Sequence, residues 1–572
     1  MKQKPHYQLL TKAAEQGKHI DGWNVYPRPQ MKREGYQILK NGWTLNGQSI
    51  RVPFPPQSAL SDYADVVGDE LTYETTFSIP EEFVKERVLL HFGAVDQVAK
   101  VYVNDTLVGE HEGGYLPFSF DITEVAKRDG ENRLVVKVVD TLSHIYPYGK
   151  QREKRGGMWY TPVSGIWQNV WIENVPEKDI KKIVITPDME GIKLFVDTEG
   201  ATRIIIALED RESFEAEIVG RQEFYLNLAD HICRDGNRYV PQLWTVENPH
   251  LYSMKIVTQW DEVETYFALR TIAICEIDGV KRVCLNDKPI FFHGVLDQGY
   301  YCDGIFLPAE PEEYERDILR MKELGFNMLR KHIKIEPECF YYYCDKHGML
   351  VIQDMVSSGE YSFIRDTALP TIGMKNRSDR GGKEDKRKEV FREHTKGTIE
   401  HLYNHPCIVA YTIFNEGWGQ FDSDAMYDFV KELDHTRLID STSGWFAQEK
   451  NDFDSEHIYF KVKELEVKNR PLFVSECGGY SRVVEGHHYS KGKVYGYGKA
   501  ADEDALTEMI VNMYEKMILP AIEDGVCGCI YTQLSDVEDE VNGFYTYDRK
   551  VCKVNKKAMQ ELAKKLVVKD CM

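Results

Sequence analysis

The sequence predicts three domains: two β-sandwiches followed by a (β/α)8 barrel. The chain has 572 residues, enough for about three or four domains of about 100–200 residues each. Residues 70 to 275 consist of short strands separated by turn residues, which is typical of β-sandwiches. From about residue 280, apolar strands alternate with helical patterns, as they do in a barrel.

The first sandwich is expected from strands between residues 70 and 175. Arg87–Phe92 alternates apolar and polar side chains, and Asn104–Asp105 is a turn pair between two strands. The expected strands are Arg87–Phe92, Lys100–Val103, Thr106–Val108, Asn132–Val139 and Trp167–Ile172. This pattern favours a sandwich over a helical bundle.

The second sandwich is expected from short strands at spacings of roughly 10 residues, which is typical of an immunoglobulin-like domain of about 100 residues. The expected strands are Ile183–Ile185, Ile192–Val196, Thr202–Leu208, Tyr252–Thr258 and Thr265–Leu269. We therefore expect domains over residues 1–176, 177–276 and 277–572.

The barrel is expected from eight apolar segments with helices interspersed. The strand candidates are Pro289–Phe292, Phe326–Leu329, Met349–Ile352, Ile408–Phe414, Leu438–Ser441, His457–Tyr459, Leu472–Ser475 and Gly528–Tyr531. A helical stripe of apolar residues runs from Tyr314 to Leu324 and is stopped by Gly325. Further helices are expected over Cys339–Lys346 and Ala425–Leu433.

Two loops between barrel strands and helices are long, and loops at this end of a barrel shape pockets. Residues 356–395 carry the charge run Arg380 to Arg387, which is typical of a solvated surface. Residues 477–503 carry two histidines and three tyrosines: His487, His488, Tyr489, Tyr495 and Tyr497.

The overall charge and hydropathy exclude some partners. The formal net charge is −21, which argues against nucleic acid, because phosphates require basic patches. The chain has no run of about 18 apolar residues that would predict a membrane span, and its polar start has no apolar signal segment. We expect a cytoplasmic protein with no membrane partner. The oligomeric state, including a homo-oligomer, stays open.

The cysteines indicate core thiols and no metal site. The sequence has 12 cysteines, none before Cys233 and none in a CxxC pair. Scattered cysteines of this kind indicate reduced thiols and argue against structural zinc. With no clear cluster of histidines and acidic residues either, we expect no metal and no cofactor.

Two apolar runs each lead into a glutamate, Glu416 and Glu476. Parallel barrel strands present their carboxyl ends to the active-site mouth, and strands four and seven face each other across it. A retaining glycosidase needs two carboxyl groups about 5–5.5 Å apart, and the amide of Asn415 is placed to bond a sugar 2-hydroxyl. Two solvated carboxylates at strand ends are the alternative.

Several separate motifs resemble those of glycoside hydrolase family 2, the family of β-galactosidases and β-glucuronidases. The motifs are Ser164–Trp171, Leu243–Pro249, Phe267–Thr271, Leu285–Pro289 and Asn415–Glu416. They follow the family's order of a sugar-binding, jelly-roll-like β-sandwich, an immunoglobulin-like β-sandwich and a TIM barrel. The resemblance implies a retaining exo-β-glycosidase acting on a small carbohydrate substrate, with Glu416 as acid/base and Glu476 as nucleophile.

The resemblance also implies substrate-binding residues. Arg330 ends strand two, where the family has an arginine near the nucleophile, and Tyr459 resembles the tyrosine that hydrogen-bonds the nucleophile. His457 lies two residues from Tyr459 and is expected to meet a sugar hydroxyl. A structural tyrosine or histidine is the alternative at both positions. Trp418 either stacks on a leaving-group sugar or packs under the rim.

The chain departs from the family pattern at several positions. Leu296–Gly299 and Lys331–Lys334 differ from the runs that many relatives have after strands one and two. The departures place Asp297, His332 and Lys334 where sugar contacts are made. Tyr531 stands where many relatives have a tryptophan platform for the sugar.

The sugar itself is the weakest inference. β-Glucuronidases of the family have Asn-x-Lys after strand eight, whereas this chain has Asn542–Phe544 without a lysine. Lys334 or Arg549 would have to supply the positive charge instead. We expect a β-galactosidase. The alternatives are a β-glucuronidase, a β-galacturonidase, a β-mannosidase or, from another class, a non-catalytic carbohydrate-binding protein.

Overall fold

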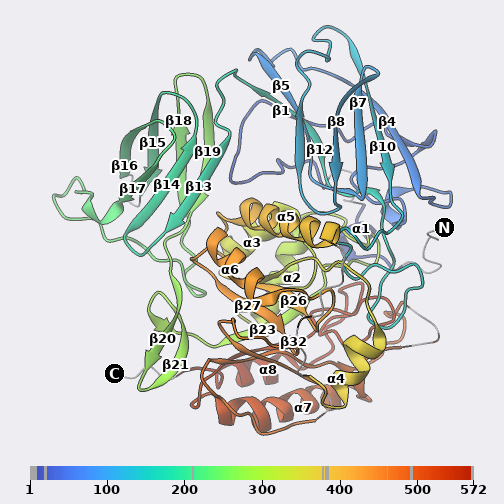
Figure 1. Cartoon of the computed structure of the whole chain (residues 1–572), viewed down its shortest axis with the longest axis vertical. Coiled ribbons are helices and arrows are strands. Elements are labelled where there is room, and N and C mark those ends of the chain that lie inside the picture. Colours follow the sequence, from blue (N-terminus) through green and yellow to red (C-terminus); the bar gives the residue numbers. More distant parts are fainter. Residues whose placement is uncertain are drawn as a thin grey trace.

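The structure is a computed structural model that describes residues 9–17, 22–208, 212–375, 379, 385–459, 461–489, 492 and 494–568. Two β-sandwiches lie side by side above a parallel barrel, the N-terminal one on the right of Figure 1 and the middle one on the left. This confirms the predicted order of two sandwiches and a barrel. Of the predicted charge run, residues 380–384 lie outside the described residues.

The N-terminal sandwich packs two main antiparallel sheets, with a short helix, α1 (Lys12–Glu15), before them. One sheet contains β3 (Gln48–Ser49), β2 (Thr44–Leu45), β4 (Glu70–Ser78), β10 (Glu131–Val139), β7 (Val98–Val103) and β8 (Thr106–Glu112). The other contains β1 (Tyr36–Ile38), β12 (Val170–Val175), β5 (Arg87–Phe92) and β9 (Phe118–Asp121), and β6 (Val95–Asp96) pairs with β11 (Gly165–Ile166). The last predicted strand begins three residues late, at Val170, because the indole of Trp167 turns inward and donates to the carbonyl of Gly114 at 2.7 Å.

The middle sandwich has more strands than predicted. One sheet contains β13 (Lys182–Pro187), β14 (Gly191–Asp197) and β17 (Glu223–Asn227), and the other contains β16 (Ser213–Val219), β15 (Ala201–Ala207), β18 (Tyr252–Val257) and β19 (Glu262–Phe267). The predictions missed β16 and β17, although Ser213–Val219 alternates polar and apolar side chains; each strand buries only one side chain. A separate sheet of β20 (Ile272–Ile277), β21 (Val280–Leu285) and β22 (Lys288–Pro289) then leads into the barrel.

The barrel has eight parallel strands, and each overlaps a segment that the sequence predicted. Their spatial order is β27 (Leu438–Ser443), β26 (Ile408–Asn415), β25 (Leu350–Asp354), β24 (Met328–Lys331), β23 (Phe292–Asp297), β32 (Val526–Thr532), β29 (Leu472–Gly478) and β28 (Asp454–Ile458). The prediction for strand one was wrong in its bounds. Lys288 and Pro289 pair antiparallel with β21, so only Phe292 of the predicted segment lies in β23.

Helices cover the outside of the barrel, and a short strand pair, β30 (Tyr480–Ser481) and β31 (Tyr497–Lys499), follows β29. The helices are α2 (Glu312–Glu323), α3 (Glu338–His347), α4 (Leu369–Thr371), α5 (Asp385–Leu402), α6 (Ser423–Leu433), α7 (Glu503–Met513) and α8 (Lys556–Ala563). The predicted apolar stripe forms α2 and buries Tyr314, Ile318 and Met321. The predicted helices at Cys339 and Ala425 are α3 and α6.

The N-terminal sandwich and the barrel share one hydrophobic core. Trp159, Tyr160 and Trp167 of the sandwich belong to the same buried cluster as the barrel strands. The backbone N–H of Thr161 donates to Oε1 of Glu538, beyond β32, at 3.0 Å. These contacts hold the segment around residues 150–161 over the carboxyl end of the barrel.

Two further observations concern the whole chain. Within the described ranges, no helix is both long enough and apolar enough to cross a membrane. Seven of the eleven described cysteines are buried.

Trp244 should anchor the middle sandwich to the barrel. It is fully buried, and its indole donates to the carbonyl of Asp345 in α3 at 2.8 Å. Trp244→Ala should lower the free energy of unfolding by about 3–5 kcal/mol, since a buried aromatic side chain is replaced by a cavity. Urea denaturation followed by tryptophan fluorescence measures the change. The control is Trp260→Ala, because Trp260 is half-buried under Lys178. This substitution should lower the free energy of unfolding by about 1 kcal/mol or less. Equal losses in both variants would contradict the anchoring role.

Candidate active site

Glu416 directly follows β26 in a tight turn. Its φ is +54°, in the left-handed region that is uncommon for a residue with a side chain. The next residue, Gly417, has φ +71°, and a Cβ there would lie 2.0 Å from the ring of Phe446. Backbone strain of this kind is often found at functional sites, and here it turns the Glu416 side chain toward the barrel mouth.

Glu476 lies inside β29, which continues to Gly478. The expectation that both glutamates follow their strands was therefore wrong for Glu476. One carboxylate oxygen of Glu476 and one of Glu416 lie within 4.8 Å of each other. This is close to the separation of about 5–5.5 Å between the carboxyl groups of retaining glycosidases.

Both glutamates line one pocket at the carboxyl end of the barrel. Its walls come from the N-terminal sandwich, four barrel strands and the loops after β23, β24, β26, β28, β29 and β32. The lining residues are Lys150, Met158, Leu296, Gln298, His332, Asn415, Glu416, Tyr459, Glu476, Tyr495, Tyr497, Thr532 and Glu540.

Arg330 lies beneath the pocket, with no exposed surface, and ties Glu476 to the barrel. Its guanidinium donates to Oε1 of Glu476 at 3.1 Å and to Oδ1 of Asp354 at 3.0 Å. A third branch donates to Oδ1 of Asn415 at 2.8 Å. Arg330 therefore compensates the charge of Glu476 and orients Asn415, while Asn415 keeps its amide hydrogens for a ligand.

The phenol of Tyr459 donates to Oε2 of Glu476. Its hydroxyl also lies 3.2 Å from Oγ1 of Thr532, and both residues line the pocket. Glu476 thus receives one donor on each oxygen, Arg330 on Oε1 and Tyr459 on Oε2. This fixes the carboxylate plane with respect to the cavity.

Glu416 has no such cation in direct contact. Burial raises its pKa to about 7, and the charges of Lys150 and Arg330 oppose this rise. Oε1 of Glu416 lies 2.7 Å from Nδ1 of His457. Burial lowers the pKa of His457 to about 3, so that ring is neutral. The surroundings of the two carboxyl groups therefore differ. Glu476 contacts a guanidinium, whereas Glu416 contacts a neutral imidazole.

His332 and His457 differ in their access to the pocket. His332 lines it, and its Nδ1 contacts Oδ2 of Asp354 at 2.7 Å. The side chain of His457 is fully buried and contacts Glu416. The expectation that His457 meets a sugar hydroxyl was therefore wrong.

Asp297 and Lys334 do not reach the pocket, contrary to expectation. Oδ2 of Asp297 accepts from Lys331 at 2.6 Å, and its other oxygen accepts from the backbone N–H of Gly299. The ammonium of Lys334 donates to the carbonyls of Gly299 and Phe306 and to the carboxylate of Glu336. An ammonium has three hydrogens to donate, so none is left for a sugar.

Trp418 and Tyr531 also lie outside the pocket. Trp418 is 3% exposed, and its indole donates to the carbonyl of Gly359 at 3.0 Å. It therefore packs under the rim, one of the two alternatives that the sequence left open. Tyr531 packs on Gly478 and Phe544 and accepts a backbone N–H. Neighbouring strand residues face opposite sides, and it is Thr532 that faces the cavity.

The sequence predictions missed the contribution of the N-terminal sandwich. Lys150 and Met158 come from that domain, and Glu540 from the loop after β32. Nothing local in the sequence marks Lys150, because its position depends on the packing between domains. Tyr495 and Tyr497 lie in the long loop that was predicted to shape the pocket, so loop length was a usable signal there.

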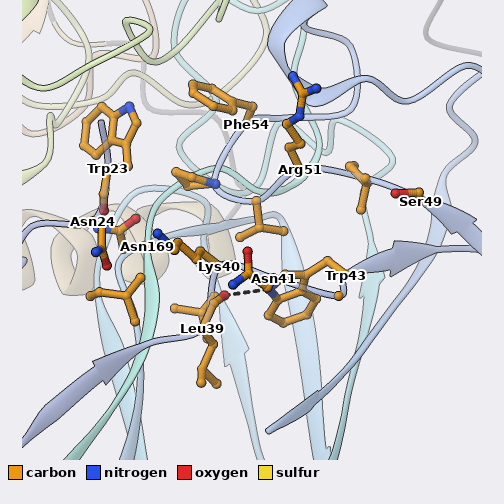
Figure 2. Close-up of a pocket in the computed structure, with 16 residues that line it drawn as sticks. Trp23, Asn24, Leu39, Lys40, Asn41, Trp43, Ser49, Arg51, Phe54 and Asn169 are labelled. Carbon is orange, nitrogen blue, oxygen red and sulfur yellow. Dashed lines mark hydrogen bonds between the residues drawn. The ribbon is translucent and has the colours of Figure 1, made fainter. Parts of the chain in front are cut away.

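A second cavity, of about 210 Å³, lies in the N-terminal sandwich (Figure 2). Its 16 lining residues include Trp23 and Trp43 but no aspartate or glutamate. The two indoles are 6% and 2% exposed, so little of either ring face is open to a ligand. This cavity therefore lacks the groups needed for acid–base cleavage.

Glu416, His457 and Glu476 also form a group that has the composition of a metal site. One ligand atom from each lies within 4.8 Å of the others, and among the residues that the structure describes it is the one such group. The fixed partners of the two carboxyl groups suit proton transfer and nucleophilic attack. That the chain uses no metal stays a prediction.

Two curated β-galactosidases resemble the chain. Those of Thermoanaerobacter pseudethanolicus and Thermoanaerobacterium thermosulfurigenes are 26% and 27% identical to it over 379 and 444 residues. The alignments cover 63% and 71% of this chain, but 46% and 57% of the relatives. The chain thus spans about half the length of the curated relatives it matches.

Solved structures share the fold over nearly the whole chain. A β-glucuronidase of an uncultured Clostridium sp. has a TM-score of 0.72 at 21% identity and covers 95% of this chain and 99% of its own. A Ruminococcus gnavus β-glucuronidase in complex with D-glucuronic acid has a TM-score of 0.69 at 19% identity, with 96% and 100% covered.

Two family models match separate parts of the chain. Residues 50–176 match the sugar binding domain of glycosyl hydrolases family 2, and residues 276–477 match the TIM barrel domain of the same family. Together the two matches cover more than half of the chain, in the order seen in the fold. The chain belongs to glycosyl hydrolase family 2.

Proposed function

We propose that the chain is a retaining exo-β-glycosidase that uses Glu476 as nucleophile and Glu416 as acid and then base. The observation that carries the proposal is the pair of carboxyl groups, with oxygens within 4.8 Å, in one pocket. The unequal surroundings of the pair support the two roles. A group with a pKa near 7 is suited to proton transfer at neutral pH, and Glu416 is such a group.

In the first step, Glu476 attacks the anomeric carbon while Glu416 gives its proton to the glycosidic oxygen. The bond from the anomeric carbon to that oxygen breaks, a covalent glycosyl-enzyme forms, and the aglycone leaves as an alcohol. Arg330 and Tyr459 hold the attacking carboxylate in its plane. The amide of Asn415 is free to bond the sugar 2-hydroxyl, a contact that strengthens in the transition state.

In the second step, Glu416 is a carboxylate and takes a proton from water. The oxygen of that water attacks the anomeric carbon and displaces Glu476, so the sugar leaves with its β configuration retained. The walls of the pocket support cleavage of a terminal sugar. Lys150 and Met158 close one side, and Tyr495 and Tyr497 close another.

For the sugar we propose a β-galactoside. The curated relatives bear that name, and the Asn-x-Lys expected for glucuronides is absent. Neither substitute that the sequence offered reaches the pocket. Lys334 is bound to Glu336, and Arg549 lies against Asp317 and the carbonyl of Tyr547.

A β-uronide is the second candidate, because Lys150 favours it. This ammonium lines the pocket and has no hydrogen bond or ion pair to any residue that the structure describes. The ammonium lies 5.9 Å from the centre of the ring of Trp159. A substrate carboxylate would give Lys150 a partner.

The two glutamates should have separable effects. Glu476→Gln should lower kcat at least about a thousandfold on every β-glycoside, because the nucleophile is lost. Glu416→Gln should lower the turnover of nitrophenyl glycosides by about 10²–10⁴. It should also show a burst of nitrophenol, since this leaving group needs no proton. Stopped-flow absorbance on a panel of galactoside, glucuronide, galacturonide, mannoside and glucoside measures both effects.

The control is Glu338→Gln, whose carboxyl lies outside the pocket although burial also raises its pKa to about 7. It should keep the wild-type rates, and a chelator should leave them unchanged. Full activity in Glu476→Gln would contradict the nucleophile assignment. A folded wild type that cleaves none of the five sugars would favour the carbohydrate-binding alternative.

Lys150 separates the two substrate candidates. If the substrate is a uronide, Lys150→Met should lower kcat/KM for it by about 10²-fold, the value of a charged hydrogen bond, and leave the galactoside within a few-fold. If galactosides are the substrates, both rates should change little. The control is Lys154→Met, because Lys154 is exposed. A uronide that both variants cleave at the wild-type rate would exclude Lys150 as its carboxylate partner.

A further inference from the structure

The barrel sheet is open between β27 and β28, since no backbone ladder joins these fully described strands. Side chains bridge them instead. Four of these side chains form a chain of hydrogen bonds that we call the serine relay: Ser443, Ser475, Ser455 and Asp440. One end of the relay meets Nε2 of His457, whose Nδ1 meets Glu416.

Every contact in the serine relay has hydrogen-bond length. Oγ of Ser455 donates to Oδ2 of Asp440 at 2.9 Å and lies 2.6 Å from Oγ of Ser475. Oγ of Ser443 donates to Oγ of Ser475 at 2.9 Å. Nε2 of His457 lies 3.0 Å from Oγ of Ser443.

The number of protons fixes the direction of the chain, because each hydroxyl has one to donate. Ser455 gives its proton to Asp440, so Ser475 is the donor to Ser455. The proton of Ser475 is then used, and Ser443 donates to Ser475. Ser443 has no proton left, so the contact with His457 must be donated by Nε2–H of the imidazole.

The acceptor end of the relay is well defined. Asp440 is fully buried, and its other oxygen accepts from the amide of Asn451 at 3.1 Å. Burial raises the pKa of Asp440, while the charge of Arg330 and side-chain hydrogen bonds from Asn451, Ser455 and Ser443 oppose the rise. A carboxylate in that position can only accept.

We propose that the serine relay fixes the proton of His457 on Nε2, so that the bare Nδ1 accepts a hydrogen bond from Glu416 and holds it as a carboxylic acid. The inference rests on the proposed function, in which Glu416 is the general acid, and it adds His457 as a positioning residue. Once Glu416 has given up its proton, its carboxylate faces the Nδ1 lone pair. That repulsion favours the recovery of a proton from water in the second step.

The imidazole is held rigidly enough for this role. A Cβ on Gly444 would lie 2.6 Å from Cγ of His457, so the ring lies directly on the glycine backbone. The ring of Trp445 packs edge-on against that of His457, with 5.4 Å between the ring centres. Its indole N–H donates to the carbonyl of Glu416. The ring is buried and neutral, so it has one proton to place.

Other charges face the same two groups, and the test must separate them from the serine relay. The charges of Lys150, Arg330 and Lys375 lower the pKa of Glu416, and that of Asp366 raises it. The pKa of His457 is raised by Glu476 and lowered by Arg330, His332 and Lys375. The phenols of Tyr361, Tyr459, Tyr495 and Tyr497 also lie within electrostatic range of Glu416. None of these is changed by a substitution at Ser443.

Ser443→Ala removes the acceptor of Nε2–H. The imidazole is then free to carry its proton on Nδ1 and to donate it to the Glu416 carboxylate, which favours the charged form. A general acid works only while protonated, so kcat/KM falls as pH rises through its pKa. The alkaline limb of the pH profile should therefore move to lower pH by about one unit, and Ser443→Thr should restore it.

The matched control is Ser441→Ala. Ser441 is a buried serine of the same strand whose hydroxyl donates to the carbonyl of Lys450, outside the relay. It should leave the alkaline limb in place. An unshifted limb in Ser443→Ala would overturn the proposal, and so would equal shifts in both alanine variants.

A second measurement does not depend on turnover. In protein labelled with ¹⁵N-histidine, the ring nitrogens of His457, assigned by comparison with His457→Gln, report the tautomer directly. The wild type should show Nε2–H at neutral pH, and Ser443→Ala should show a larger share of Nδ1–H. A wild-type Nδ1–H tautomer would overturn the relay even in an active enzyme. The expected tautomer in a protein that cleaves no glycoside would leave the relay standing and place the failure in the proposed function.

Discussion

The buried guanidinium of Arg330 is the interaction on which the site depends. It joins three strands of the barrel, two of them adjacent, contacting Asp354 at the end of β25, Asn415 at the end of β26 and Glu476 in β29. A guanidinium suits this role because its donors have a fixed planar geometry. Loss of one partner from a buried ion pair costs about 3–5 kcal/mol, so the geometry of the site and the stability of the barrel depend on the same group.

The site separates its two glutamates by giving them unequal partners. Glu476 faces a guanidinium and a phenol, both of which donate to it. Glu416 faces a neutral imidazole, and burial raises its pKa to about 7. Two carboxyl groups this close cannot both ionise freely. In the proposed function, these unequal neighbours assign the role of nucleophile to Glu476 and that of acid to Glu416.

The candidate active-site pocket is not formed by the barrel alone. Lys150 and Met158 belong to the N-terminal sandwich, and Tyr160 donates to Glu540 across the same junction. The shared hydrophobic core fixes this arrangement. The one unpaired cation that lines the pocket, among the residues described, comes from the sandwich. If Lys150 binds a substrate carboxylate, as in the uronide alternative, substrate choice depends on the packing of the two domains.

The sequence by itself determined the fold and the pair of glutamates that we propose as the reacting groups. Apolar strands with turn residues between them, and the change to alternating strands and helices after residue 280, reflect local periodicity that burial imposes on each element. Glu416, Glu476, Arg330 and Tyr459 could be found because they lie at or near the carboxyl ends of barrel strands. Only the tertiary structure decided which neighbours face the pocket. A shift of one residue along a strand reverses the direction of a side chain, which is why Thr532 and not Tyr531 lines the cavity. Lys334 is paired with Glu336, and Lys150 comes from another domain. Neither placement could be predicted, because both depend on contacts between segments far apart in the chain.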